Sequence, residues 1–153
     1  MYFSAKAEYA VLAMLELATR HADTKPIQLK VIVDAHGIPD RFLVQILLQL
    51  KGAGLVHSTR GAAGGYQLAR RPDEISLADI INVIDRADEP DSPRSPAKNR
   101  AAQSHAAPES PSLRETRAVW ADIHAAQQKI LEATTLAELV RRAQPADAFT
   151  YQI

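Results

Sequence analysis

Apolar residues recur at every third or fourth position over most of the first half of the chain, which is the pattern of amphipathic helices. Three helices are predicted there, over residues 4–21, over residues 28–35 and from residue 39 to residue 52 or 54. Ser4 is a favoured capping residue for the first helix, and Gly37 fits the end of the second. The connection between the second and third helices is about as long as the turn of a helix-turn-helix. The pattern therefore predicts that motif.

The third helix has one side that suits a core and one that suits a surface. The residues predicted to face inward are Phe42, Leu43, Ile46 and Leu47. The residues predicted to face outward are Asp40, Arg41, Val44 and Gln45. In a helix-turn-helix the second helix lies in the major groove, where arginine can pair with guanine, glutamine with adenine and aspartate with cytosine. For each of these residues an ordinary solvated position is the alternative interpretation.

A glycine-rich β-hairpin is predicted directly after the third helix, with strands over residues 55–60 and 65–69. The positive backbone dihedrals of a tight tip are assigned to Gly61, Gly64 and Gly65. Arg60 lies beside the tip, where the wing of a winged helix meets the DNA backbone, and Tyr66 is expected to pack at the base. Alone, this could be an ordinary surface hairpin. The preceding helix pair favours a winged helix-turn-helix.

The second half of the chain changes in composition. Ser76, followed three residues later by an aspartate, is predicted to cap a fourth helix that packs beneath the wing. Residues 88–112 are rich in proline, serine and small side chains, which predicts a flexible loop because they offer little apolar surface to bury. A long helix is predicted over residues 113–133, and Thr135 is predicted to cap a short last helix. The tail, residues 148–153, is apolar and β-prone.

Charge limits how the chain could bind nucleic acid. Its 153 residues carry 18 basic and 18 acidic side chains, so bulk electrostatic attraction alone cannot be the basis of binding. Residues 39–71, however, hold five basic residues against the single Asp40, a local charge of +4. No stretch is apolar enough for a membrane span, and the N-terminus is unlike a signal peptide. The cytoplasm is the predicted location.

No catalytic or metal-binding set is visible in the sequence. The chain has no cysteine, which excludes disulfides, thiolate nucleophiles and cysteine-held zinc or iron–sulfur sites. The histidines fall on different predicted elements and are interpreted as structural or solvated; they are His21, His36, His57, His105 and His124. The glycines around Gly64 precede a strand, unlike those of a nucleotide-binding loop, and no nucleophile elbow is present. The chain is predicted not to be an enzyme.

Three segments together resemble the Rrf-two family of bacterial winged-helix transcription regulators, of the IscR, NsrR and CymR type. They are MYFSAKAEYAVLAMLELA, IPDRFLVQILLQLKGAGLVHSTRGAAGGYQLAR and EISLADIINVID. The resemblance is closest over residues 1–86. It implies a mainly α fold with a small β-hairpin wing, organised as a DNA-binding head over residues 1–87, a loop over residues 88–112 and a dimerisation segment over residues 113–153.

The resemblance also implies a binding site and an assembly. The recognition helix enters the major groove of double-stranded DNA, the wing arginine reaches the minor groove, and the two heads of a homodimer contact the half-sites of a palindrome. The DNA-binding positions are then Ser4, Lys6, Asp40, Arg41, Phe42, Val44, Gln45, Arg60, Gly61, Gly64 and Gly65. Dimer contacts are implied for an apolar stripe of the long helix that the small head alone cannot cover, formed by Val119, Trp120, Ile123 and Ile130.

The chain departs from the family pattern in two ways. Val44 occupies a position that is usually acidic in the family, which removes a cytosine acceptor and favours contact with a thymine methyl, so a shifted operator sequence is predicted. Many members also hold an iron–sulfur cluster through cysteines in the loop before the long helix. This chain has only His105 there, so no cluster and no other cofactor is expected. The cysteine-free sequence is most similar in character to the CymR branch.

Two functions stay open at this stage. The first is a homodimeric, sequence-specific DNA-binding repressor without a bound metal. The second is a dimeric winged-helix protein-interaction module that has exchanged DNA for a protein partner, which the zero net charge and Val44 leave open. Cysteine synthase is such a partner by analogy with the CymR branch, and the C-terminal Ile153 matches the terminal isoleucine that partners insert into that enzyme. Replacing Arg60 with alanine separates the two functions.

Overall fold

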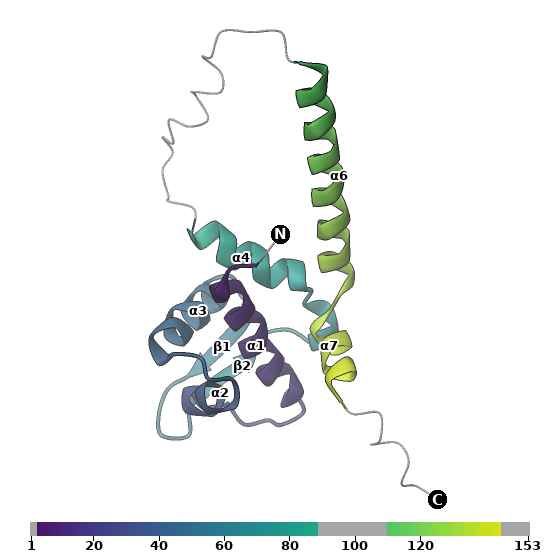
Figure 1. Cartoon of the computed structure of the whole chain (residues 1–153). Coiled ribbons are helices and arrows are strands. Elements are labelled where there is room, and N and C mark those ends of the chain that lie inside the picture. The colour runs from purple at the N-terminus through teal and green to yellow at the C-terminus, as the bar shows by residue number, and fades with distance from the viewer. Residues whose placement is uncertain (1–2, 89–109, 145–153) are drawn as a thin grey trace, which may run out of the picture.

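The computed structural model describes residues 3–88 and 110–144. The fold is mainly helical with one two-stranded antiparallel hairpin, as predicted. Along the chain the elements are α1 (Ala5–Thr19), α2 (Leu29–His36), α3 (Asp40–Gly52), β1 (Val56–Thr59), β2 (Gly65–Leu68), the 3-10 turn η1 (Pro72–Glu74), α4 (Leu77–Asp88), α6 (Pro111–Ala133) and α7 (Leu136–Ala143). Figure 1 shows α1 to α4 and the hairpin gathered into a head, with α6 extending beyond it.

Side-chain caps define several helix ends at the predicted places. The Ser4 hydroxyl accepts a hydrogen bond from the backbone N–H of Ala7 at 3.1 Å, at the start of α1. Ser76 and Asp79 cap α4 reciprocally. The Asp79 N–H donates to the Ser76 hydroxyl at 3.2 Å, and the Ser76 N–H donates to the Asp79 carboxylate at 2.9 Å. Thr135 caps α7. These local signals were sufficient to place the helix starts.

Other helix ends differ from the prediction. Helix α1 ends at Thr19 and not near His21. Helix α6 begins at Pro111, two residues before the predicted start, because the Ser110 hydroxyl accepts from the N–H of Leu113 at 3.2 Å. Proline is well suited to the first helical position, where its missing N–H would have no partner in the helix. The rest of the predicted loop and the β-prone tail lie outside the described residues.

A main hydrophobic core holds the head together, and a smaller cluster is formed by Ala78, Ile81 and Leu131. The largest fully buried side chains of the main core are Met14, Leu17, Ile32, Ile38, Leu43, Ile46, Leu47, Leu50, Leu55, Ile75, Ile80 and Ile84. Helix α4 packs against α1 and α3. Ile80 and Ile84 of α4 are buried in the same core as Val56 of β1 and Leu68 of β2, and the prediction that α4 lies beneath the wing stays a prediction. The core fixes the position and the rotation of α3 in the head.

The end of α6 and the start of α7 also join the head. The Leu77 N–H donates to the Thr134 carbonyl at 2.9 Å, and the Leu136 N–H donates to the Ile75 carbonyl at 2.9 Å. Leu136 is fully buried in the same core as α1. Helix α7 thus packs with the head, although the sequence groups it with the dimerisation segment. The predicted division into domains stays a prediction.

Candidate nucleic-acid interface

The rotation of α3 decides which of its side chains can meet a partner. Its buried residues, Leu43, Ile46, Leu47 and Leu50, occupy one face. The four residues predicted to point outward are all exposed, namely Asp40, Arg41, Val44 and Gln45. Helix α3 therefore presents a mixed surface of cationic, amide, carboxylate and apolar groups. These are the groups that hydrogen-bond to base edges or contact thymine in the major groove.

Phe42 was predicted to face inward, and this prediction is wrong. Its side chain is 48% exposed, and its ring lies 6.5 Å from the ring of Tyr9 on α1, at an interplanar angle of 50°. With 100° between successive residues, position 42 falls at the edge of the buried face, which Leu43 and Ile46 already fill. The contact with Tyr9 also places the N-terminal half of α1 beside the first turn of α3.

Leu48 is an outward residue that the sequence analysis did not name. It is 68% exposed on the third turn of α3. It follows Val44 by four positions, which places both on the same side of the helix. The spacing was visible in the sequence, but a leucine within an apolar run gives no sign that it lies outside the core.

The hairpin forms where it was predicted, with strands slightly shorter than predicted, and its tip depends on glycine. Val56 pairs with Leu68 at the base, and Thr59 pairs with Gly65 at the last position before the tip. Gly61 has a φ of 109°, which confirms its predicted conformation. The same prediction for Gly64 is wrong, since its φ is not positive. Glycine is required there because an added Cβ would lie 2.1 Å from the Thr59 carbonyl oxygen.

The hairpin is bonded to the segment before α2, and this anchor was not predicted. The Ile27 N–H donates to the Tyr66 carbonyl at 2.9 Å, and the Tyr66 N–H donates to the Ile27 carbonyl at 2.8 Å. The Gln67 side-chain amide also donates to the Thr24 carbonyl at 3.2 Å. The Tyr66 side chain is partly buried against the core, as expected. A single-residue bridge leaves no periodic signal in a sequence, so only the structure reveals it.

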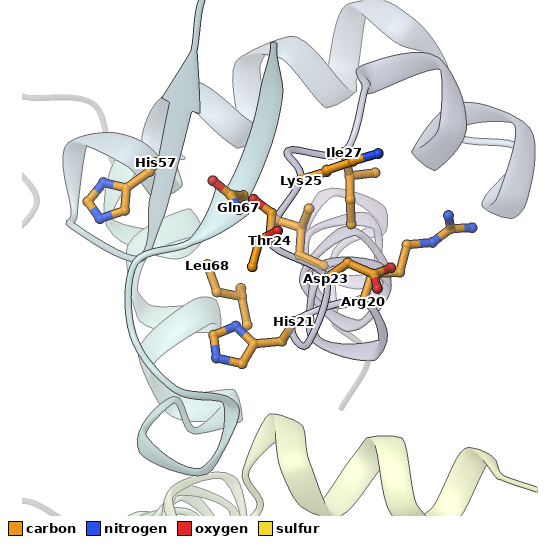
Figure 2. A pocket seen from close by; sticks show the side chains of 10 residues that line it. Arg20, His21, Asp23, Thr24, Lys25, Ile27, His57, Gln67 and Leu68 are labelled. Carbon is orange, nitrogen blue, oxygen red and sulfur yellow. Dashed lines mark hydrogen bonds between the residues drawn. The ribbon is translucent and has the colours of Figure 1, made fainter. Parts of the chain in front are cut away.

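A small pocket of about 170 Å³ lies between this segment and the hairpin (Figure 2). Its lining residues are Leu17, Arg20, His21, Asp23, Thr24, Lys25, Ile27, His57, Gln67 and Leu68. In Figure 2 the cationic ends of Arg20 and Lys25 lie well apart from the two imidazoles, so the lining does not converge on one point. Arg20 also bonds Glu16 at 2.8 Å. The pocket does not have the arrangement of a catalytic centre.

The other histidines and acids of the described residues do not form a metal site either. His36 Nε2 lies 3.2 Å from the Glu16 carboxylate, which links α2 to α1. Within residues 3–88 and 110–144, no group of three or more histidine, cysteine, aspartate or glutamate side chains could hold a metal ion. His105 lies outside these ranges. The same described residues include no helix long and apolar enough to cross a membrane.

The basic side chains are distributed over the recognition helix and the hairpin. Arg41 is exposed on the first turn of α3, and Arg60 is exposed at the start of the hairpin tip. The Lys51 ammonium at the end of α3 donates to the Ser58 hydroxyl of β1 at 2.6 Å, so the two elements are joined directly. Arg71 forms an ion pair with Asp73 at 2.8 Å. Helix α3 and the hairpin tip therefore each present one exposed arginine, Arg41 and Arg60.

Two further predicted DNA-binding residues lie at the start of α1. Ser4 is exposed, and its hydroxyl is used as the helix cap. Lys6 is half-buried and has an interaction partner. The Tyr9–Phe42 contact brings this end of α1 close to the first turn of α3. The DNA-binding role of all the named positions stays a prediction.

Helix α6 exposes the apolar stripe that the sequence predicts. The exposed fractions are 56% for Val119, 61% for Trp120, 42% for Ile123 and 66% for Ile130. Of the residues of α6, Leu131 alone is buried. The head therefore covers just the C-terminal end of a helix of 23 residues. Contact of this stripe with a second copy stays a prediction.

Comparison with known proteins identifies the family. Residues 3–142 match the Rrf2 family, described as an iron-dependent transcriptional regulator. The chain belongs to the Rrf2 family. It is similar to Rv1287 of Mycobacterium tuberculosis H37Rv, named among the HTH-type transcriptional regulators, with 40% identity over 95% of this chain and 84% of that protein. It is 36% identical to the HTH-type transcriptional regulator CymR of Bacillus subtilis, over 91% of this chain and 89% of CymR.

Solved structures of Rrf2 proteins confirm the winged-helix fold. The structure of T. potens IscR superposes with a TM-score of 0.73 at 31% identity, covering 100% of this chain and 94% of IscR. The structure of CymR, the global cysteine regulator of B. subtilis, gives a TM-score of 0.71 at 32% identity, covering 94% of this chain and 99% of CymR. The relatives and the fold are those of transcription regulators and not of enzymes, in agreement with the prediction.

The family description implies iron, but the residues of this chain do not fit a cysteine-held cluster. The sequence contains no cysteine at any position. A typical protein-bound iron–sulfur cluster requires four ligands, mostly cysteine thiolates. The described residues also lack any cluster of alternative ligands. The residues of this chain therefore do not fit a cysteine-held iron–sulfur cluster.

Proposed function

We propose that this Rrf2 regulator is a homodimer that binds a palindromic DNA operator sequence-specifically and represses transcription without an iron–sulfur cluster. The observation that carries the proposal is the exposure of Arg41 and Gln45 on α3, a helix that packs against β1 of the hairpin whose tip begins with the exposed Arg60. The local charge of +4 over residues 39–71 provides attraction to phosphates that the neutral chain as a whole lacks.

The two elements are suited to different grooves. Arg41 and Gln45 can form paired hydrogen bonds with guanine and adenine, which present distinct donor and acceptor patterns in the major groove. Arg60, followed by small tip residues, can approach the minor groove or the backbone closely. The Lys51–Ser58 hydrogen bond and the Ile27–Tyr66 bridge hold the hairpin in a fixed position relative to α3. A preorganised pair of contacts of this kind loses little entropy on binding.

The dimer is supported by the exposed stripe of α6. Trp120 and Ile130 are more than half exposed, which is unfavourable for a helix with no partner. A separate apolar groove of about 390 Å³ lies where α1, α4 and the end of α6 meet, and Val11, Ile81 and Leu131 are among its lining residues. Two heads joined through α6 would match the two-fold symmetry of a palindrome.

The first experiment is selection of bound fragments from the source genome by the purified, metal-free protein. The best fragment is then titrated by fluorescence anisotropy at two salt concentrations. We expect a palindrome, with affinity that falls steeply as salt rises. Failure to enrich any sequence, with the dimer intact by sedimentation, would contradict the proposal.

Arg60→Ala tests the wing within this experiment. We expect affinity for the selected fragment to fall about tenfold and the salt slope to decrease by about one, because one cationic contact is lost. Arg114→Ala on α6 is the matched control, since Arg114 is exposed and pairs with Glu115 at 3.7 Å, away from the hairpin. Equal affinities for the wild type and Arg60→Ala would favour the protein-interaction module.

That alternative has less support from the described residues. The Ile153 analogy with cysteine synthase partners lies outside them. A cysteine synthase partner and a cytoplasmic location stay predictions. Binding of purified cysteine synthase to the full chain and to a variant lacking Ile153 would test the first of them directly.

A further inference from the structure

Large apolar side chains are exposed on two helices in particular. Among the described residues they are Phe3, then Phe42, Val44 and Leu48 on α3, and Leu113, Val119, Trp120, Ile123 and Ile130 on α6. Leu48 is the most exposed of them, at 68%. Four other residues of α3 are buried in the core. Replacing the exposed Leu48 with alanine would therefore leave the packing of the core unchanged. The proposed dimer explains the apolar residues of α6 but not this leucine.

Leu48 belongs to the same face of α3 as the predicted base contacts. Val44, Gln45 and Leu48 follow Arg41 by three, four and seven positions, and all four residues are exposed. At 100° per residue Arg41 and Leu48 lie within about 20° of each other around the helix axis. Homeodomains contact bases with residues at this same spacing on their recognition helix. The exposed positions that could contact bases therefore extend from the first to the third turn of α3.

We infer that Leu48 is a specificity-determining residue, which together with Val44 contacts thymine methyl groups in the major groove. This inference rests on the proposed DNA-binding function. The C5 methyl of thymine is the apolar group that base pairs present in that groove. Val44 and Leu48, one turn apart, form an apolar strip, and Arg41 and Gln45 add polar contacts on the same face. Such a strip selects thymine at the positions it covers.

The spacing of the two side chains also limits where those thymines lie. Residues four positions apart are separated by about 6 Å along a helix. Successive base pairs are about 3.4 Å apart along the DNA axis. One Val44–Leu48 pair can therefore contact methyl groups on neighbouring base pairs or on pairs two steps apart. Each half-site should contain two thymines at one of these separations, on either strand.

The test uses the duplex that the wild-type protein selects from a random library. Each thymine is replaced singly by deoxyuridine, which removes the methyl group and leaves every hydrogen-bonding group unchanged. We expect one or two positions at which uracil weakens wild-type binding about three- to tenfold. Leu48→Ala should bind the thymine duplex more weakly by a similar factor and should no longer respond to uracil at one of those positions. Because no charge is lost, the salt slope should not change.

Three controls make the result specific to Leu48. Leu48→Met keeps an apolar chain of similar length and should restore the response to uracil. Leu113→Ala removes an exposed leucine from α6 and should respond to uracil like the wild type. Thermal melting should show that Leu48→Ala is folded, as expected for an exposed position. These variants separate a missing methyl contact from a general loss of apolar surface.

The outcomes distinguish this inference from the function on which it rests. If the wild type selects no sequence, both fail. If it selects a palindrome but Leu48→Ala responds to uracil as the wild type does, the DNA-binding function stands and the role of Leu48 is wrong. If Leu48→Ala binds every duplex with wild-type affinity, Leu48 does not touch DNA, and its exposure serves a protein contact instead.

Discussion

Helices α3 and α6 both expose large apolar side chains, but in different surroundings. On α3 the exposed Val44 and Leu48 lie among arginine and glutamine side chains, and the opposite face is fully buried. On α6 the exposed apolar residues form a stripe, and Leu131 is the only residue of this helix that is buried. The first arrangement fits a polar partner with small apolar groups, such as a DNA groove. The second fits another apolar surface.

The difference also concerns how each helix is held. Helix α3 is fixed on its inner side by the core and at its C-terminal end by the Lys51–Ser58 hydrogen bond to the hairpin. Helix α6 is attached to the head near Thr134 and Leu136, and Figure 1 shows the rest of it extending freely. A fixed helix can preorganise hydrogen bonds to bases, whereas an extended one needs a partner along its length. Under the proposed function, α3 serves recognition and α6 serves assembly.

Trp120→Asp should have the largest effect on this division of roles. A carboxylate within the stripe would be buried against apolar groups on dimerisation, which is strongly unfavourable. We expect a monomer by analytical ultracentrifugation and a loss of roughly 100-fold or more in affinity for the palindrome, because binding of the second head is no longer intramolecular. Trp120 is 61% exposed, so the head itself should stay folded.

The matched control for this variant is Ala125→Asp. Ala125 is exposed on the side of α6 opposite the stripe, and its replacement introduces the same charge. It should leave both the dimer and the affinity unchanged. Dissociation of the Ala125 variant, or a persistent Trp120→Asp dimer, would show that the stripe is not the assembly surface.

Gly64→Ala should have an intermediate effect, on recognition alone. The added Cβ would lie 2.1 Å from the Thr59 carbonyl oxygen, so the hairpin tip must shift. We expect affinity for the selected palindrome to fall about tenfold, in line with backbone strain of about 1–3 kcal/mol. The dimer should persist in sedimentation. Ala63→Ser, at an exposed neighbouring position, is the control, and equal effects of the two changes would contradict the steric argument.

The parts of the fold that sequence reasoning placed correctly are those with local signals. The caps at Ser4, Ser76 and Thr135, and the apolar spacing of α1 and α3, each depend on residues a few positions apart. The helix pair followed by the glycine-rich hairpin predicted the winged-helix fold, the family resemblance implied the same fold, and the comparison with solved structures confirms it. Local chemistry and a specific motif were sufficient here because each signal is carried by neighbouring residues.

The features that sequence reasoning missed depend on contacts between distant residues. The Ile27–Tyr66 bridge joins residues 39 positions apart, and no sequence pattern around either residue predicts it. Leu136 belongs to the predicted dimerisation segment, but its side chain is buried in the core of the head, together with residues of α1. Phe42 was wrongly predicted to face inward, and Leu48 was not named as an exposed residue. Hydrophobicity alone does not distinguish a core position from an exposed one. Which apolar residues find space inside is decided by the packing of the whole head.

The smallest predicted effect concerns α7, where the two regions meet. The Arg142 guanidinium, and to a lesser degree that of Arg141, hydrogen-bonds the Glu138 carboxylate and lowers its pKa below the ordinary value of 4.5. Between pH 4.5 and the lowered pKa of Glu138, the folded state therefore binds fewer protons than the unfolded chain. The stability from these pairs is present above that pH and is lost as the pH falls through the lowered value.

Glu138→Gln tests this contribution through thermal melting. We expect the wild type to melt slightly above the variant at neutral pH, and the two melting temperatures to converge as the pH falls below 4.5. Added salt should narrow the neutral-pH difference, because exposed ion pairs are screened. Glu132→Gln is the control, since the partner of that carboxylate is the amide of Gln128 at 2.9 Å. A difference for Glu138→Gln that stays constant through the acid range would mean that its arginine pairs do not stabilise the junction between α7 and the head.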